Sequence, residues 1–144
     1  MDFKLAALKL TVAQLKEAIP HHSPASSFTL GNGGVLFQRA WLQGLLVSND
    51  INNATNSPPR FLLDDGTGIV ELVSINNQFS QANWQNGMYV MVVGTYVDRS
   101  DKHELPLIRI HKLVDLSAFP DREAMWYLEV IEAYRMFYVP FIEE

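Results

Sequence analysis

The segment Asp65-Gly66-Thr67-Gly68 is the stretch of this chain that comes closest to a catalytic motif. It differs from the Asp-Thr-Gly signature of aspartic proteases, because a glycine separates the acid from the threonine. A single carboxylate also cannot form the shared-proton pair of those enzymes without a second copy. Aspartate and glycine both tolerate positive φ, and such a run is typical of a hairpin turn. We therefore predict a turn here and not a catalytic acid.

The histidines are the other side chains that could bind a metal or move a proton. His21 and His22 are adjacent in a polar segment, and because a zinc site needs three or four ligands we interpret them as a surface pair. Cysteine is absent, which excludes disulfides, thiolate zinc sites and cysteine nucleophiles. No serine or threonine belongs to a pattern typical of nucleophilic catalysis. The sequence thus predicts no enzyme, no metal and no cofactor.

Composition and charge limit the remaining functions. The chain has 144 residues, of which 48% are hydrophobic and 11% aromatic, enough for one core without metal or disulfide cross-links. Its net charge of -5 argues against a positive groove that follows a nucleic-acid backbone. Apolar runs such as 89–93 are far shorter than the roughly 20 residues of a membrane helix. We expect a soluble intracellular protein with weak or no direct DNA binding and no membrane contact.

Hydrophobic patterning predicts a mainly β domain. In the first strand we expect Trp41 and Val47 inside, and Gly44 at a sharp bend. Residues 49–59 and 74–86 are expected to be a loop and a crossover. The predicted strands are Arg39–Ser48, Arg60–Asp64, Ile69–Val73, Tyr89–Asp98 and Leu105–Asp115.

The N-terminal segment fits neither the period of a strand nor that of a helix throughout. Residues 9–12 could be a strand, or Thr11 and Gln14 could form the capping box of a short helix. Residues 21–34 have the composition of a loop. We therefore predict an N-terminal arm and linker over residues 1–34, and a core domain over residues 35–144.

The C-terminal segment from Pro120 to about Tyr138 is predicted to be a helix, with proline and acids in its first turn. It carries apolar residues on more than half of its circumference, so one row can pack on the barrel and another must be covered by a partner protein. The first row is Trp126, Val130, Tyr134 and Phe137, and the second row is Met125, Leu128 and Ile131.

Four blocks in fixed order resemble the small, second subunit of the RMI complex, from the family of RecQ-mediated genome instability proteins. They are residues 39–44 (RAWLQG), 87–94 (GMYVMVVG), 112–117 (KLVDLS) and 126–130 (WYLEV). The likeness covers roughly residues 35–135, with a weaker match at residues 8–10. It implies a mainly β fold, a five-stranded OB-fold barrel with a C-terminal α-helix, and no catalysis.

The resemblance also implies partners. Such a subunit pairs with the C-terminal OB-fold of the larger RMI subunit and joins topoisomerase III alpha and a RecQ-type helicase in the nucleus. That complex serves homologous recombination, DNA repair and genome stability by dissolving double Holliday junctions. In the family, the residues matching Lys9 and Trp126 belong to the surface that meets the larger subunit, and Lys112 is expected to contact that subunit or a further recruited protein.

From these inferences we predict a partner interface in which the C-terminal helix enters a groove of the other OB-fold. Trp126 is expected to anchor the helix, and Lys9 to orient it through a charged contact. The complete predicted interface is Lys9, Lys112, Trp126, Val130, Tyr134 and Phe137.

The alternative is a single-stranded DNA-binding OB-fold, like the middle subunit of replication protein A or a telomeric relative. Residues 128–131 (LEVI) fit the C-terminal helix of such a subunit. Against it, the chain is acidic, and Phe61 is the only aromatic residue in the second and third strands, where it is expected to lie in the core. The aromatic tail 136–144 is predicted to cap the barrel.

Overall fold

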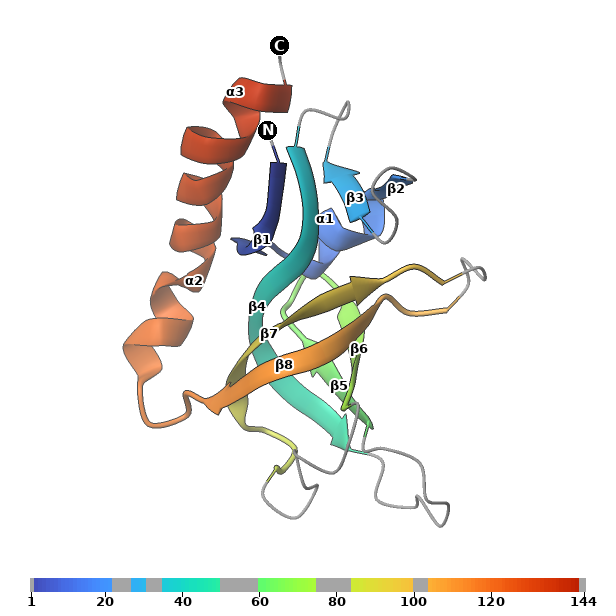
Figure 1. Cartoon of the computed structure of the whole chain (residues 1–144). Helices are drawn as coiled ribbons and strands as arrows, with labels where there is room; N and C mark the ends of the chain where they lie inside the picture. The colour runs from blue at the N-terminus through green and yellow to red at the C-terminus, as the bar shows by residue number, and fades with distance from the viewer. Residues whose placement is uncertain are drawn as a thin grey trace.

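Five strands of this chain pair edge to edge and close into a barrel (Figure 1). In the computed structural model the described residues are 2–21, 27–30, 35–49, 60–74, 84–99 and 104–142. The barrel strands are β4 (Val35–Asn49), β5 (Arg60–Asp64), β6 (Ile69–Val73), β7 (Tyr89–Val97) and β8 (Leu107–Asp115). They are hydrogen-bonded in the order β4-β5-β6-β8-β7, and β7 pairs back onto β4. The predicted barrel is confirmed.

A glycine is required where β4 passes the end of β5. A Cβ atom at Gly44 would lie 2.6 Å from the backbone oxygen of Asp64, so no other residue fits where β4 passes this close to β5. The prediction that Val47 lies inside is wrong, because its side chain is 40% exposed. Inward positions on this part of β4 are Ala40, Leu42 and Leu46, and Val47 alternates to the outer face.

Trp41 also occupies an outward position of β4. It is nevertheless half-buried, because the C-terminal helix covers it. Trp41 therefore does not lie inside the barrel as predicted. It lies on the outer face of the barrel, beneath the helix.

Several of the described residues before Val35 are part of the core, so the predicted N-terminal arm and linker is wrong for them. β1 (Asp2–Lys9) pairs in parallel with β4, followed by helix α1 (Val12–Glu17), β2 (Ile19–His21) and β3 (Ser27–Leu30). A strand followed directly by a helix explains the mixed periodicity of the sequence. The buried side chains of this segment include Leu8, Leu10, Val12, Leu15, Phe28 and Leu30.

The helical alternative for residues 11–19 is confirmed, and the strand alternative for residues 9–12 is wrong beyond Lys9. Thr11 and Gln14 form the predicted capping box: the Gln14 N–H donates to Thr11 Oγ1 over 3.2 Å, and the Thr11 N–H donates to Gln14 Oε1 over 2.8 Å. The helix ends at Glu17.

Asp65 joins the predicted hairpin turn to helix α1. Its carboxylate is buried and accepts hydrogen bonds from the N–H groups of Thr67 and Gly68 within the turn, at 2.8 and 3.2 Å. It also accepts the N–H of Val12 over 2.8 Å, which is the first residue of the helix. The turn prediction is therefore confirmed, and the same carboxylate satisfies a helix N-terminus 53 residues away in sequence.

A small ion cluster ties β5, β6 and the end of β7. Glu71 bonds Arg60 and Arg99, and Arg99 also pairs with Glu104 at 3.1 Å. Burial raises the pKa of Glu71, but hydrogen bonds and charge from Arg99 and Arg60 outweigh burial and hold that pKa below its ordinary value.

The C-terminal helix forms as predicted but changes its winding. α2 (Pro120–Ala133) continues into a π-helical turn, η2 (Tyr134–Tyr138), and then α3 (Val139–Ile142). The wider turn moves the next inward position from Phe137 to Tyr138. Tyr138 is buried and its hydroxyl donates to the Lys9 carbonyl over 3.3 Å, so the predicted cap is confirmed at this residue.

The structure does not test every prediction. Residues 50–59 of the predicted loop, residues 75–83 of the predicted crossover, His22, and the side chain of Phe141 lie outside what is described. No helix in the described ranges is long and apolar enough to span a membrane.

We predict that Asp65→Ala lowers the free energy of unfolding by about 2–4 kcal/mol, because it leaves the buried N–H group of Val12 and the partly buried N–H groups of Thr67 and Gly68 without their acceptor. Urea denaturation measures the loss. Asp64→Ala is the matched control, since Asp64 accepts the N–H of Gly66 in the same turn, and it should cost about 1 kcal/mol or less. Equal losses for the two variants would contradict the capping role.

We also predict that Glu71 contributes to the pH dependence of stability. Because its pKa is lower in the folded than in the unfolded protein, its contribution is present above the unfolded pKa and disappears as the pH falls through the folded pKa. Urea denaturation of wild type and Glu71→Gln should show a stability difference at neutral pH that shrinks on acidification below pH of about 4. A difference that stays constant over this range would refute the assignment.

Candidate partner-binding surface

The side chains that could act in catalysis or bind a metal either have structural roles or are not grouped with the further ligands that a metal site needs. The described residues contain no group of three or more histidine, cysteine, aspartate or glutamate side chains that could hold a metal ion. Asp65 caps α1, and His111 shares a hydrogen bond of 2.6 Å with Thr95 Oγ1. The C-terminal helix is the part of the described surface that is the best candidate for a binding site.

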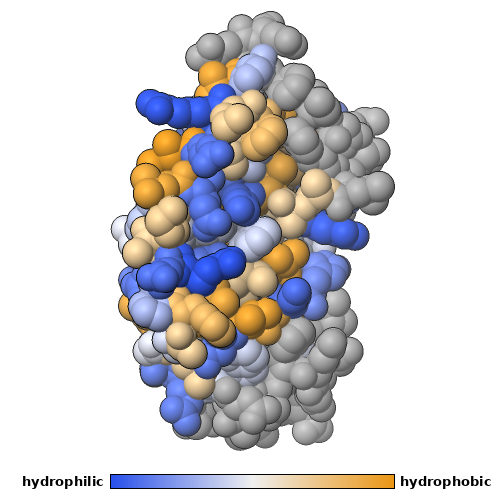
Figure 2. All heavy atoms as spheres, turned by 90° about the vertical axis from the view of Figure 1, so that its left-hand side faces the viewer, coloured by the Kyte–Doolittle hydropathy of each residue, from blue (hydrophilic) through white to orange (hydrophobic). Residues whose placement is uncertain are grey.

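Exposed apolar side chains gather on this helix. Of the eleven large apolar side chains that are exposed in the described ranges, eight lie between Phe119 and Phe137. Figure 2 views the helix side of the molecule and shows apolar patches separated by hydrophilic residues. We call Met125, Leu128 and Ile131 the outer row; these side chains are 50%, 58% and 51% exposed. The second row of the sequence analysis is thus the one that faces solvent.

The opposite face of the helix is held by stacked side chains. The Trp126 ring stacks on Trp41 at 6.1 Å between centroids, and Lys9 Nζ lies 4.8 Å from the centroid of Trp41. Lys9 also pairs with Glu129 at 3.6 Å. We call Lys9, Trp41 and Trp126 the tryptophan stack. It brings β1, β4 and α2 together at one point.

Two predicted interface residues therefore point away from solvent. Trp126 and Val130 are only 1% and 3% exposed, so in the chain by itself both pack on the barrel, and the predicted contact of Trp126 with a partner stays a prediction. The cause is Trp41: its outward ring on β4 leaves an aromatic surface that the widest side chain of the helix covers. Two tryptophans, one on a strand and one on a helix, were the sequence signal for this contact.

The other predicted interface residues are accessible in three places. Tyr134 and Phe137 are exposed on η2, and Lys112 is exposed on β8. Lys9 lines a groove of about 470 Å³ between β1 and the C-terminal helix, together with Phe137 and Glu132. β1 pairs only with β4 among the described strands, so its second edge borders this groove. The structure thus brings Lys9 and Phe137 together at this groove, whereas Lys112 does not line it but lies in register with Lys9 across Trp41 and Val93.

Beneath the helix lies a polar network that the sequence did not indicate. Trp41 Nε1 donates to Gln43 Oε1 over 3.3 Å, and Gln43 Nε2 donates to the Tyr89 hydroxyl over 3.2 Å. Burial raises the pKa of Tyr89, which keeps its hydroxyl protonated. Trp126 Nε1 is buried without a hydrogen-bond partner in the described part of the chain. This network fixes the base on which the helix packs.

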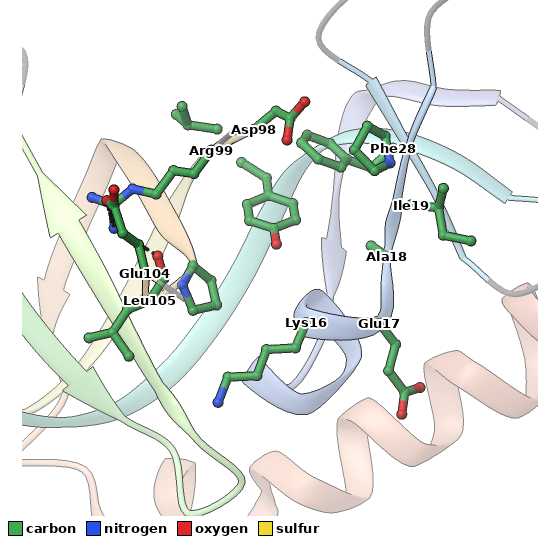
Figure 3. Close-up of a pocket in the computed structure, with 13 residues that line it drawn as sticks. Lys16, Glu17, Ala18, Ile19, Phe28, Asp98, Arg99, Glu104 and Leu105 are labelled. Atoms are coloured by element: carbon green, nitrogen blue, oxygen red, sulfur yellow. Dashed lines mark hydrogen bonds and ion pairs between the residues drawn. The ribbon is translucent and has the colours of Figure 1, made fainter. Parts of the chain in front are cut away.

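A second cavity, of about 550 Å³, lies between α1, β2 and the ends of β7 and β8 (Figure 3). Lys16, Glu17, Asp98, Arg99 and Glu104 all line it. Arg99 is occupied by Glu104 and by Glu71. Because both cations and carboxylates line this cavity, it favours no ligand of one charge.

Solved structures show which fold this is. The chain is similar to a chain of the S. pombe Stn1-ten1 complex, with a TM-score of 0.70, 15% identity, and coverage of 88% of this chain and 89% of the other. It is similar to a chain of a replication protein A heterotrimer bound to ssDNA, with a TM-score of 0.68, 19% identity, and coverage of 90% and 96%. It is also similar to a chain in a crystal structure of yeast Stn1 and Ten1, with a TM-score of 0.67, 13% identity, and coverage of 95% of this chain and 77% of the other. At these identities the likeness shows the OB-fold alone.

Sequence comparison identifies the family. The comparison with curated proteins found no match. The family model for RecQ-mediated genome instability protein 2 (RMI2) matches residues 6–134, which include the second half of β1, the whole barrel and α2. The chain therefore belongs to the RMI2 family and is an OB-fold protein of genome maintenance.

Proposed function

We propose that this protein is a non-catalytic OB-fold subunit that pairs with the C-terminal OB-fold of the larger RMI subunit through its C-terminal helix. The observation that carries the proposal is the outer row, which is apolar and exposed on a helix whose other face is already packed. Monomeric proteins seldom leave so many large apolar side chains of one helix in water. A helix of the partner that packs against Met125, Leu128 and Ile131 would remove it from solvent.

The energetics favour this assignment. Fully burying a leucine, isoleucine or methionine contributes about 1.5–3 kcal/mol, and the outer row is already about half-buried. Burying the outer row together with Phe137 and Tyr134 would contribute more free energy than burying any one of these side chains. This free energy must also offset the entropy that is lost on association. A stable pair therefore needs the whole length of the helix.

The tryptophan stack supports this pairing indirectly. Trp126, Trp41 and Lys9 hold the helix in a fixed orientation before any partner binds, so little conformational entropy is lost on association. Lys9 and Phe137 line the adjacent groove, where a second element of the partner would contact them. In this proposal the role of Trp126 is to position the outer row.

Within the cell, the pair would join topoisomerase III alpha and a RecQ-type helicase in the nucleus, and would support the dissolution of double Holliday junctions. Membership of the RMI2 family supports this role. The alternative is a single-stranded DNA-binding subunit like the middle subunit of replication protein A or a telomeric protein. The shared fold favours this alternative, but no particular residue of the chain does. Phe61, the aromatic of its second strand, is buried in the core.

We predict that the double variant Leu128→Glu/Ile131→Glu folds normally but no longer co-elutes with the C-terminal OB-fold of the larger RMI subunit. Both side chains are exposed, so the melting temperature should change little, whereas two carboxylates would be desolvated in the interface. Size-exclusion chromatography and thermal unfolding measure the two properties.

Val47→Glu is the matched control for this experiment, because it introduces the same charge at an exposed apolar site on the barrel. It should retain the complex. Wild-type co-elution of the Leu128→Glu/Ile131→Glu variant would overturn the proposed surface.

We further predict that Trp126→Ala lowers the free energy of unfolding by about 3–5 kcal/mol, since it removes a large side chain from a packed site. Any loss of the complex would then follow from a displaced helix. Trp126→Phe should retain most stability, because it keeps an aromatic ring on Trp41 and removes the unpartnered N–H. Unchanged urea denaturation of Trp126→Ala would contradict the tryptophan stack as the support of the helix.

A further inference from the structure

A small pocket beside the first half of α2 differs from the other two cavities in its charge. It has a volume of about 230 Å³ and lies between the helix, β4 and the turn that joins β5 to β6. Carboxylates line it, but none of the described lysine, arginine or histidine residues does. The other two cavities both have a cation in their walls. We call the cavity lined by Asp64, Asp65, Tyr89, Glu123, Trp126 and Tyr127 the acidic pocket.

Aromatic side chains form a large part of its wall. Tyr89 and Trp126 are buried and therefore belong to the inner wall, whereas Tyr127 is 45% exposed and lies at the mouth. Aromatic rings attract cations through the negative charge of their faces, and carboxylates attract them directly. Both kinds of lining side chain thus favour a positively charged ligand.

Hydrogen bonds hold the walls of the acidic pocket in place. At the mouth, the Tyr127 hydroxyl donates to the backbone carbonyl of Asp65. Gly66, at a φ of +88°, leaves room for this contact, because a Cβ atom there would lie 2.5 Å from the same hydroxyl oxygen. Inside, Gln43 Nε2 donates to the Tyr89 hydroxyl. Since the walls are fixed beforehand, a ligand loses little of its binding energy to ordering them.

The carboxylates of the pocket are not neutralised by the chain itself. Among the described residues neither Asp64 nor Glu123 forms an ion pair. Asp65 accepts hydrogen bonds from uncharged N–H groups, which leave its charge in place. Burial raises the pKa of the Tyr127 hydroxyl, and the charges of the three carboxylates raise it further. The mouth of the pocket is therefore a region of negative potential.

The arrangement of the carboxylates indicates the shape of the cation. They are not grouped closely enough to hold a metal ion, in the part of the chain that the structure describes. An arginine guanidinium is planar, carries five N–H donors that can reach separate carboxylates, and stacks on aromatic rings. The volume is also below the roughly 300–1,000 Å³ of pockets for drug-sized molecules. The acidic pocket thus fits the end of a single arginine side chain.

The indole N–H of Trp126 indicates that this arginine belongs to a peptide. Trp126 Nε1 is buried and has no acceptor among the described residues, although buried donors in proteins normally have one. A guanidinium has no acceptor atom, but the peptide that carries an arginine has carbonyl oxygens. A protein ligand can therefore bring both the cation and the acceptor to this site.

We propose that the acidic pocket binds an arginine side chain of the protein partner that covers the outer row. This inference rests on the proposed function and adds the residue type that the partner must bring. Glu123 and Tyr127 alternate along α2 with Met125 and Leu128, so a partner packed on the outer row lies beside the mouth of the pocket. Asp64 and Glu123 bind the guanidinium, and the Tyr127 ring packs against it.

The first test uses the isolated full chain and N-acetyl-arginine-N-methylamide as the probe. Titration followed by ¹H–¹⁵N NMR should show dissociation constants on the order of millimolar, with shifts at the Trp126 indole N–H and the Gly66 amide. The uncharged citrulline analogue should bind at least about tenfold more weakly. Absence of these shifts with the arginine probe would overturn the proposal. Equal or tighter binding of the lysine analogue would refute the choice of arginine.

Asp64→Asn/Glu123→Gln should lower the affinity for the arginine probe at least about tenfold, because it removes both unpaired carboxylates and keeps the size of each side chain. The matched control is Glu17→Gln/Asp121→Asn, which changes the net charge equally at two exposed sites outside the acidic pocket. It should bind the probe like wild type. An equal loss in this control would mean that only the overall charge matters, and the proposal would be wrong.

Tyr127 separates the role of the ring from that of the hydroxyl. Tyr127→Leu should weaken binding of the probe about two- to fivefold, because it removes the aromatic face. Tyr127→Phe keeps the ring and should retain most of the affinity. Equal affinities for Tyr127→Leu and wild type would exclude the ring from the site.

The second test measures the pairing itself. By isothermal titration calorimetry, Asp64→Asn/Glu123→Gln should bind the C-terminal OB-fold of the larger RMI subunit at least about tenfold more weakly than wild type and than the control variant. Wild-type affinity of this variant, while Leu128→Glu/Ile131→Glu loses the complex, would leave the pairing intact and refute the arginine contact. Retention of the complex by Leu128→Glu/Ile131→Glu would instead refute the pairing surface.

Discussion

The contact on which the functional surface depends is the packing of Trp126 against Trp41. It decides which face of the C-terminal helix is turned to the barrel and, by exclusion, which face is left for a partner. Lys9 lies over the same Trp41 ring and pairs with Glu129 of the helix, so β1 is part of the same contact. A barrel that lacked this contact would keep its strands but would lose the direction of its helix.

Local irregularities then adjust what each element presents. The π-helical turn η2 moves Tyr138 inward and leaves Phe137 in solvent beside the groove that Lys9 also lines. The bulge opposite Gly94 turns His111 outward beside Lys112. In each case one extra residue changes the face of the side chains around it.

Much of the fold could be predicted from the sequence. The hairpin of β5 and β6, the apolar strand β7, the capping box of α1 and the start of α2 depend on local patterns, and all four are confirmed. The N-terminal residues could not be placed, because the pairing of β1 with β4 is a long-range contact with no local signal. For the same reason, the pattern of the helix gave two apolar rows but could not assign Trp126 to the inner one; that assignment depends on Trp41, distant in sequence.

The central claim is that the outer row becomes buried when the larger RMI subunit binds. The chain has no cysteine, so a single thiol introduced as Leu128→Cys reports on that position alone. Its rate of alkylation should fall at least tenfold when the C-terminal OB-fold of the larger RMI subunit is added, while the rate for Val47→Cys on the barrel stays the same. If the complex forms and Leu128→Cys reacts at its free rate, the partner binds elsewhere and the account is wrong.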